Sequence, residues 1–144
     1  MNIATFDAIV QELKARKPMW FAGDAEPLAT DEEIDHAEAE LGVRLPSQYK
    51  DFVHRYGGGY FGFTNVFSVN QSSEWYIVSK WDLLPPKVDF VPVTDDETGG
   101  YYGFLVSGDV CSEEVYYFHP DEDELPSFQY PSFLEYVKET GLRR

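Results

Sequence analysis

The sequence predicts an α+β fold: one domain over residues 1–144, with N-terminal helices packed on a mostly antiparallel or mixed β-sheet and a helix at the C-terminal end. Three observations support this prediction. Helical spacing of apolar residues is concentrated before residue 57, strand-like segments occupy 60–119, and helical spacing returns at 131–141. Helices grouped first and strands afterwards favour helices that cover one face of a sheet. A chain of 144 residues fits a single domain with a sizeable core.

Three helices are expected before the strands. The first covers 5–17 and ends at a proline. The second covers 30–42, where Thr30 and Glu33 have the spacing of a capping box and a glycine provides the stop. The third covers 46–56, with apolar residues at i, i+3, i+4 and i+7. We expect the core to include Ile34, Leu41, Tyr49, Phe52, Val53 and Tyr56.

Six later segments are rich in aromatic and β-branched residues, which favours strands. The strands are expected at 60–63, 66–69, 74–80, 90–94, 101–106 and 115–119. The segments 90–94 and 101–106 predict a hairpin whose connection is acidic and ends in glycine. Pro92 has no amide hydrogen, so its strand is expected at a sheet edge or with this nitrogen turned away from a ladder partner. An amphipathic helix at 131–141 closes the chain.

Glycines 57, 59 and 62 have the G-x-G-x-x-G spacing of a dinucleotide-binding fingerprint. That fingerprint needs a strand before the glycines and a helix after them, because the pyrophosphate sits on the helix N-terminus. Here the order is helix, glycines, strand. Asp82 lies about where a ribose ligand would be sought. We nevertheless interpret the glycines as a helix stop and a turn into the sheet.

The composition restricts the partners and the compartment. A formal charge of −15 and a pI near 4.3 argue against binding to nucleic acid or an anionic membrane. Between Val88 and Val137 there are twelve Asp and Glu residues and no Lys or Arg. Cys111 is the only cysteine, which excludes an internal disulfide and agrees with a reducing compartment. With no signal peptide or long apolar run in the sequence, we expect a cytoplasmic protein.

No pattern in the sequence predicts an enzyme, a cofactor or a metal site. Cys111 and His119 flank a predicted turn and could approach each other as a thiol and a base, but neither has a visible orienting partner. His36 and His54 lack the spacing of zinc ligands. The acidic run 121–124 begins like a calcium loop, but a proline stands where that loop needs glycine.

The segment TDEEIDHAEAELGVRLPSQYKDFVHRYGGG, at 30–59, resembles the opening of the SUKH superfamily of Smi-Knr type. It carries a T-x-x-E-I helix start, an E-x-x-L-G helix end, a Leu-Pro pair and a final glycine turn. The segments 88–100, 115–124 and 133–142 resemble later parts of the family more loosely. The resemblance implies a binding module without an active site: a cytoplasmic immunity protein that neutralises a cognate toxin, often a nuclease or another nucleic-acid-directed enzyme. The alternative is a regulatory or scaffolding protein-binding domain, as in the fungal relatives.

The predicted partner-binding surface combines two acidic turns with nearby tyrosines. Aromatic anchors inside a charged rim are common in tight interfaces, and acids in turns are free to engage a basic protein. The alternative is that these acids only solvate their loops. The predicted partner-binding residues are Asp95, Asp96, Glu97, Tyr101, Tyr102, Tyr117, Asp121, Glu122, Asp123 and Glu124.

Overall fold

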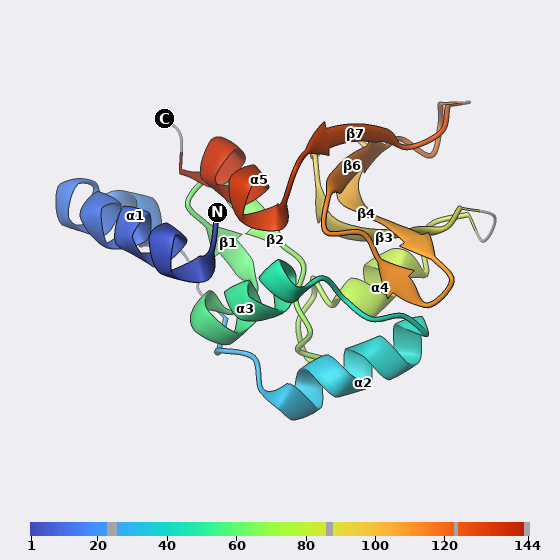
Figure 1. Cartoon of the computed structure of the whole chain (residues 1–144), viewed down its shortest axis with the longest axis horizontal. Coiled ribbons are helices and arrows are strands. Elements are labelled where there is room, and N and C mark those ends of the chain that lie inside the picture. Colours follow the sequence, from blue (N-terminus) through green and yellow to red (C-terminus); the bar gives the residue numbers. More distant parts are fainter. Residues whose placement is uncertain (23–25, 86–87, 123, 143–144) are drawn as a thin grey trace.

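The computed structural model describes residues 1–22, 26–85, 88–122 and 124–142, and it has the α+β architecture (Figure 1). The helices are α1 (Ile3–Arg16), the 3-10 helix η1 (Pro18–Phe21), α2 (Asp31–Leu41), α3 (Ser47–Tyr56), α4 (Ile77–Trp81) and α5 (Phe133–Gly141). The strands are β1 (Gly59–Phe61), β2 (Thr64–Val66), β3 (Phe90–Asp95), β4 (Tyr101–Ser107), β5 (Val110–Cys111), β6 (Val115–Phe118) and β7 (Ser127–Tyr130). Within the described residues, no helix combines the length and apolar character needed to cross a membrane.

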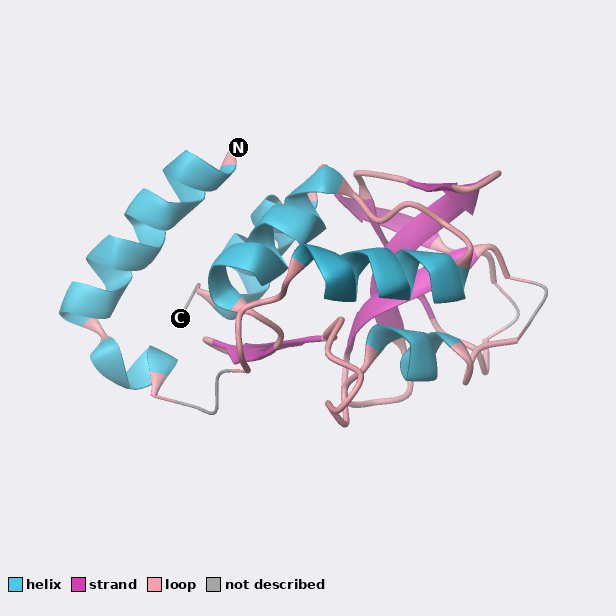
Figure 2. Cartoon of the chain, turned by 90° about the horizontal axis from the view of Figure 1, so that it is seen from below, coloured by secondary structure: helices cyan, strands magenta, loops and turns pink. Residues whose placement is uncertain are grey.

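The main sheet has the strand order β3-β4-β6-β7, and all of these neighbours are antiparallel. The short strand β5 pairs with the end of β4, while β1 and β2 form a separate hairpin. Pro92 lies on β3 at the edge of this sheet, as predicted, and the register shifts between Pro92 and Thr94. Figure 1 shows α3 and α5 between the sheet and α1, with α4 below β3 and α2 at the bottom of the view. Figure 2 shows the same arrangement from below, with α1 at one extreme of the molecule.

The N-termini of α1 and α2 are capped by hydrogen bonds between residues that are close in the sequence. The side chain of Thr30 accepts a hydrogen bond from the Glu33 amide at 3.2 Å, and the Glu33 carboxylate accepts one from the Thr30 amide at 3.0 Å. This reciprocal capping box confirms the prediction for α2. Asn2 caps α1 by accepting from the Thr5 amide at 2.8 Å, so this helix begins two residues before the predicted start.

The core is dominated by aromatic side chains contributed by α1, α3, β4 and α5. Tyr49, Phe52, Phe104 and Phe133 are fully buried, and the Tyr49 and Phe52 rings lie 5.5 Å and 5.4 Å from the Phe133 ring. Five of the six predicted core residues are buried, and Tyr56 is half-buried against the same cluster. The helix phase assigned to 46–56 is therefore confirmed.

A buried hydrogen-bond chain ties α3 to the sheet. The hydroxyl of Tyr49 donates to the Phe67 carbonyl at 2.7 Å. The Phe67 amide in turn donates to the Val93 carbonyl on β3 at 2.8 Å. Buried polar groups left unpaired cost free energy. These two bonds therefore fix the positions of α3 and of the β1–β2 hairpin relative to β3.

The glycines after α3 build a turn, in the predicted order of helix, glycines and strand. Gly57 has φ 76° and ψ −175°, a region that is essentially restricted to glycine, instead of the left-handed helical conformation expected. A Cβ atom on Gly57 would lie 2.6 Å from the Glu26 carbonyl oxygen. Gly62, with φ 57°, forms the turn between β1 and β2. Positive φ and close backbone contact explain why these positions are glycine.

The strand predicted at 74–80 is wrong, because the structure places helix α4 at Ile77–Trp81. Ile77 and Val78 favour a strand by propensity, but a single buried helical turn cannot be told from a short buried strand by an apolar run. The strand predicted at 66–69 is shifted to Thr64–Val66. Strand β7 was not predicted, because it is an exposed edge strand with little apolar alternation.

Replacing Phe52 with alanine should lower the free energy of unfolding by about 3–5 kcal/mol, because the buried ring leaves a cavity between α3 and α5. Urea unfolding measures the loss. Leu125→Ala is the control, since that side chain is 89% exposed and its removal should change stability by less than about 0.5 kcal/mol. A loss below about 1 kcal/mol for Phe52→Ala would contradict its place at the centre of the core.

Candidate functional site

The strand registers bring the predicted tyrosines and one acidic turn to the same end of the main sheet. Asp95 at the end of β3 is opposite Tyr101 at the start of β4, and Tyr101 is also opposite Phe118 at the end of β6. The turn from β3 to β4 and the loop after β6 therefore adjoin each other. His119 joins them, because its Nε2 lies 3.3 Å from the Thr98 carbonyl oxygen.

Asp96 organises the turn from β3 to β4. Its carboxylate accepts hydrogen bonds from the amides of Thr98 and Gly100, both at 2.8 Å, and from the Tyr117 hydroxyl at 2.6 Å. Partial burial opposes ionisation of Asp96, but the bonds from Tyr117, Thr98 and Gly100 lower its pKa to about 2. The same carboxylate raises the pKa of Tyr117 to about 12. Asp96 thus stabilises the turn through its own hydrogen bonds. The other negative charges of this turn belong to Asp95 and Glu97.

The tyrosines predicted as anchors are half-buried and packed against one another. Tyr102 and Tyr117 are opposite each other on β4 and β6, and their ring centroids lie 5.0 Å apart. Tyr136 of α5 packs on Tyr102 at 5.1 Å. Tyr101 contacts the Phe67 ring at 6.4 Å. Tyr101 and Tyr102 are therefore packed against the buried rings of Phe67 and Tyr136, and all three predicted tyrosines remain partly exposed to solvent.

The second predicted acidic group is divided by the structure. Asp121 and Glu122 are exposed beside the first turn, and their amides donate to His119 Nδ1 and to the His119 carbonyl. Glu124 instead lines a separate cavity of about 390 Å³ with Val88 and Leu125. Asp123 lies outside the described residues. Only part of the predicted surface is therefore continuous.

A cavity of about 210 Å³ opens beside the first acidic turn, between that turn, the β1–β2 turn and α5. Asn65, Tyr136 and Thr140 were not predicted as part of a site, since nothing in their sequence spacing links them to residues 95–97. The cavity is lined by Phe63, Thr64, Asn65, Asp95, Asp96, Glu97, Tyr102, Tyr136 and Thr140.

The residues that raised the possibility of catalysis do not meet. Cys111 pairs with Val106 near the end of β4, whereas His119 follows the strand residue opposite Tyr101, at the start of β4. Burial raises the pKa of the Cys111 thiol to about 12, so the thiolate is not formed near neutral pH. Among the described residues, no three His, Cys, Asp or Glu side chains converge to hold a metal ion.

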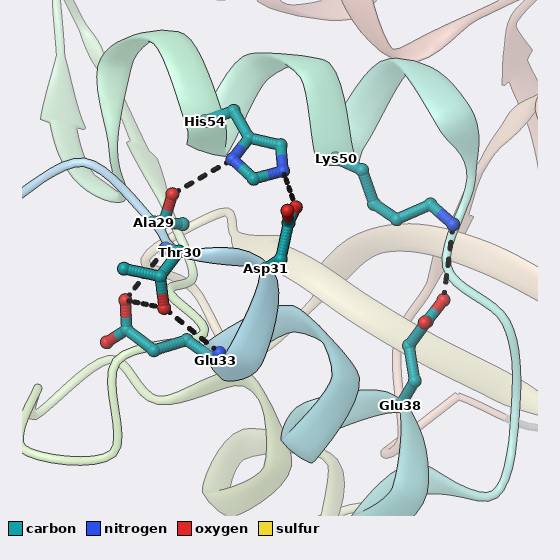
Figure 3. A network of polar contacts seen from close by, with 7 residues as sticks. All are labelled: Ala29, Thr30, Asp31, Glu33, Glu38, Lys50 and His54. Atoms are coloured by element: carbon teal, nitrogen blue, oxygen red, sulfur yellow. Dashed lines mark hydrogen bonds and ion pairs between the residues drawn. The ribbon is translucent and has the colours of Figure 1, made fainter.

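A polar cluster joins α2 to α3, and His54 and Glu38 have structural roles in it (Figure 3). His54 faces two acceptors, with Nδ1 at 2.9 Å from the Ala29 carbonyl and Nε2 at 2.9 Å from the Asp31 carboxylate. Glu38 accepts from the Leu45 amide at 2.8 Å and lies 3.4 Å from the Lys50 ammonium. These contacts hold the two helices together on the side of the molecule away from the acidic turn.

Tyr117→Phe should raise the pKa of Asp96 from about 2 towards its ordinary value of about 3.9, because the carboxylate loses its hydroxyl donor. The depressed pKa means that ionised Asp96 stabilises the fold above about pH 4 and that this contribution is lost as the pH falls towards about 2. The variant should lose stability at neutral pH and show a smaller further loss on acidification. NMR titration of the side-chain carboxyl carbon measures the pKa directly.

Tyr116→Phe is the matched control, since Tyr116 packs on Phe128 on the opposite face of β6 and should leave the Asp96 pKa unchanged. An Asp96 pKa near 3.9 in the unaltered protein, or one that does not respond to Tyr117→Phe, would contradict the proposed role of the Asp96 hydrogen bonds in stabilising the turn.

Comparison with models of known protein families identifies the family to which this chain is similar. The family model SUKH_6, described as SMI1-KNR4 cell-wall, matches residues 31–137. The match begins at α2 and reaches into α5, so it includes both acidic turns and every residue that lines the cavity beside the first turn except Thr140. No curated protein matches the sequence. The match covers most of the chain, and the protein therefore belongs to the SMI1-KNR4 family of the SUKH superfamily.

Proposed function

We propose that the protein is an immunity protein: it binds a cognate toxin, a nuclease or another nucleic-acid-directed enzyme, and blocks it without catalysing a reaction. The observation that carries the proposal is the acidic end of the sheet, where the carboxylates of Asp95, Asp96 and Glu97 line one side of a cavity in a domain of the SUKH superfamily. The protein would act in the cytoplasm, where a nucleic-acid-directed toxin meets its substrate. It would need no cofactor or metal.

Charge complementarity supports a basic protein as the partner. Enzymes that act on nucleic acid bind the phosphate backbone with Lys and Arg side chains. The present chain has a formal charge of −15, and the stretch from Val88 to Val137 has twelve acids without a Lys or Arg. Such a surface attracts a basic partner at long range and competes with the phosphates for the same side chains. Rapid capture of a toxin is the property that an immunity protein needs.

A second function is favoured by one observation, the description of the matching family as a cell-wall family. It is a regulatory or scaffolding domain that binds a protein of its own cell. Gene neighbourhood separates the two functions, because an immunity gene is expected directly beside its toxin gene. Co-purification with the product of the adjacent gene is the first test.

Reversing the charges of Asp121 and Glu122 to Lys should slow association with that adjacent gene product by about tenfold or more at low salt and weaken its salt dependence. Both acids are exposed at the rim of the surface, where charges mainly affect the association rate. Glu32→Lys combined with Asp35→Lys is the matched control, because it makes the same change in net charge on exposed positions of α2. Equal association rates for the two double variants would remove the acidic end from the mechanism.

Cys111→Ala and His119→Ala should both leave protection of toxin-expressing cells nearly intact. The thiol is buried and protonated, and His119 is engaged in joining the two turns. Survival of cells that co-express toxin and variant measures protection, and circular dichroism checks that each variant is folded. Loss of protection by a folded variant with unaltered toxin affinity would reveal a chemical step and contradict the proposal.

A further inference from the structure

We propose that the cavity between the β1–β2 turn, the acidic turn after β3 and α5 binds the guanidinium group of an arginine side chain. The proposal rests on the proposed function in one respect: the arginine belongs to the toxin, and its capture anchors the complex. The recognition chemistry itself follows from the residues that line the cavity, and it can be measured without the toxin.

The cavity holds negative charge without a cation among its lining residues. Asp95 and Glu97 contribute carboxylates, whereas Asp96 is occupied by its own turn. Burial raises the pKa of Asp95 and outweighs a hydrogen bond from the Glu97 backbone, which lowers it. The Glu97 and Asp96 charges raise this pKa further, and the Lys80 charge lowers it. A cation placed in the cavity would relieve this repulsion and favour the charged form of Asp95.

Asn65 contributes an unpaired polar side chain to the lining of the cavity. Its side chain lines the cavity and is only 7% exposed. The buried Oδ1 atom has no hydrogen-bond partner among the described residues. Buried polar atoms are nearly always paired in native proteins, so an unpaired one requires an explanation. The Asn65 Oδ1 atom therefore has acceptor capacity, beside Asp95 and Glu97, that no described residue uses.

The arrangement of the acceptors favours arginine over lysine or a metal ion. No three described carboxylate, His or Cys side chains converge on one point, as a metal ion would require. Guanidinium instead presents five donors in a plane and reaches acceptors that lie apart from one another. Its flat faces also stack on aromatic rings, and Phe63, Tyr102 and Tyr136 line the same cavity.

The backbone of Glu97 holds one of these acceptors in place. Glu97 is the one described residue other than glycine with a positive φ, 62°. The Tyr60 hydroxyl lies 3.5 Å from its carboxylate, so the side chain is oriented as well. A positive φ is uncommon for residues other than glycine, and here it occurs in the tight turn that Asp96 closes on the Thr98 and Gly100 amides.

The test is an NMR titration with N-acetyl-arginine amide, with the lysine and citrulline analogues as controls. Citrulline has nearly the same shape as arginine but no charge. Arginine should cause saturable shifts of the Asn65 side-chain amide and of the Glu97 and Tyr102 backbone amides. Lysine should bind more weakly, and citrulline should leave these signals unchanged. Shifts that do not saturate, or that spread evenly over all acidic positions, would overturn the proposal.

Two substitutions test which groups bind. Glu97→Gln keeps the shape of the side chain but removes its charge, and it should weaken arginine binding by about tenfold, the usual scale for a lost charge-assisted hydrogen bond. Asn65→Leu should abolish specific binding and raise Tm, because it removes a buried polar atom that has no partner. Asn70→Leu is the control: Asn70 accepts from the Ser72 amide at 2.9 Å, so its loss should lower Tm and leave binding unchanged. A lower Tm for Asn65→Leu with unaltered binding would show a purely structural asparagine.

The same variants separate this proposal from the proposed function. If the arginine analogue does not bind but the adjacent gene product still forms a complex, the cavity proposal is wrong and the immunity function is unaffected. If the analogue binds through Asn65 and Glu97 but the adjacent gene product does not, the guanidinium site holds, whereas the immunity function and the assignment of the arginine to a toxin are wrong.

Discussion

The buried hydrogen bond from Tyr49 to the Phe67 carbonyl is the constraint on which the arrangement of this protein depends. Burial raises the pKa of Tyr49, so its hydroxyl remains a donor at any physiological pH. Phe67 then bonds to Val93 on β3, and α3, the β1–β2 hairpin and the sheet edge become one unit. Because the hairpin is held in this position, Asn65 lies beside Asp95 and Glu97, and these residues line the cavity next to the turn after β3. A core interaction thus sets the geometry of the surface.

At the acidic end of the sheet, neighbouring carboxylates differ in the hydrogen bonds that they accept. Asp96 satisfies the amides of its turn and is held by Tyr117, which leaves Asp95 and Glu97 on either side without a comparable set of donors. His119 locks the adjacent loop to the same turn. Rigid turns reduce the conformational entropy lost on binding. In the proposed function, this order of the turns would favour the binding of a basic partner.

Structural elements were predicted correctly where they depend on residues that are close together in the sequence. The capping box of Thr30 and Glu33 and the apolar stripe around Phe52 follow from short spacings, and both are confirmed. Helix α4 was mistaken for a strand because Ile77 and Val78 have β propensity, and tertiary packing overrode it. The acids of the site were predictable from charge, but Asn65 and Thr140 were not. They reach residues 95–97 only through the fold, and one sequence without its three-dimensional contacts cannot reveal that proximity.

The central claim is that the end of the sheet bearing the acidic turns is the surface that meets the partner. The structure of the complex with the product of the adjacent gene tests this claim most directly. Our account predicts that the turn after β3 and the loop after β6 are buried in the interface, with an arginine of the toxin between Asn65 and Glu97. A complex that buries the exposed side of α2 and leaves this end of the sheet in solvent would contradict it.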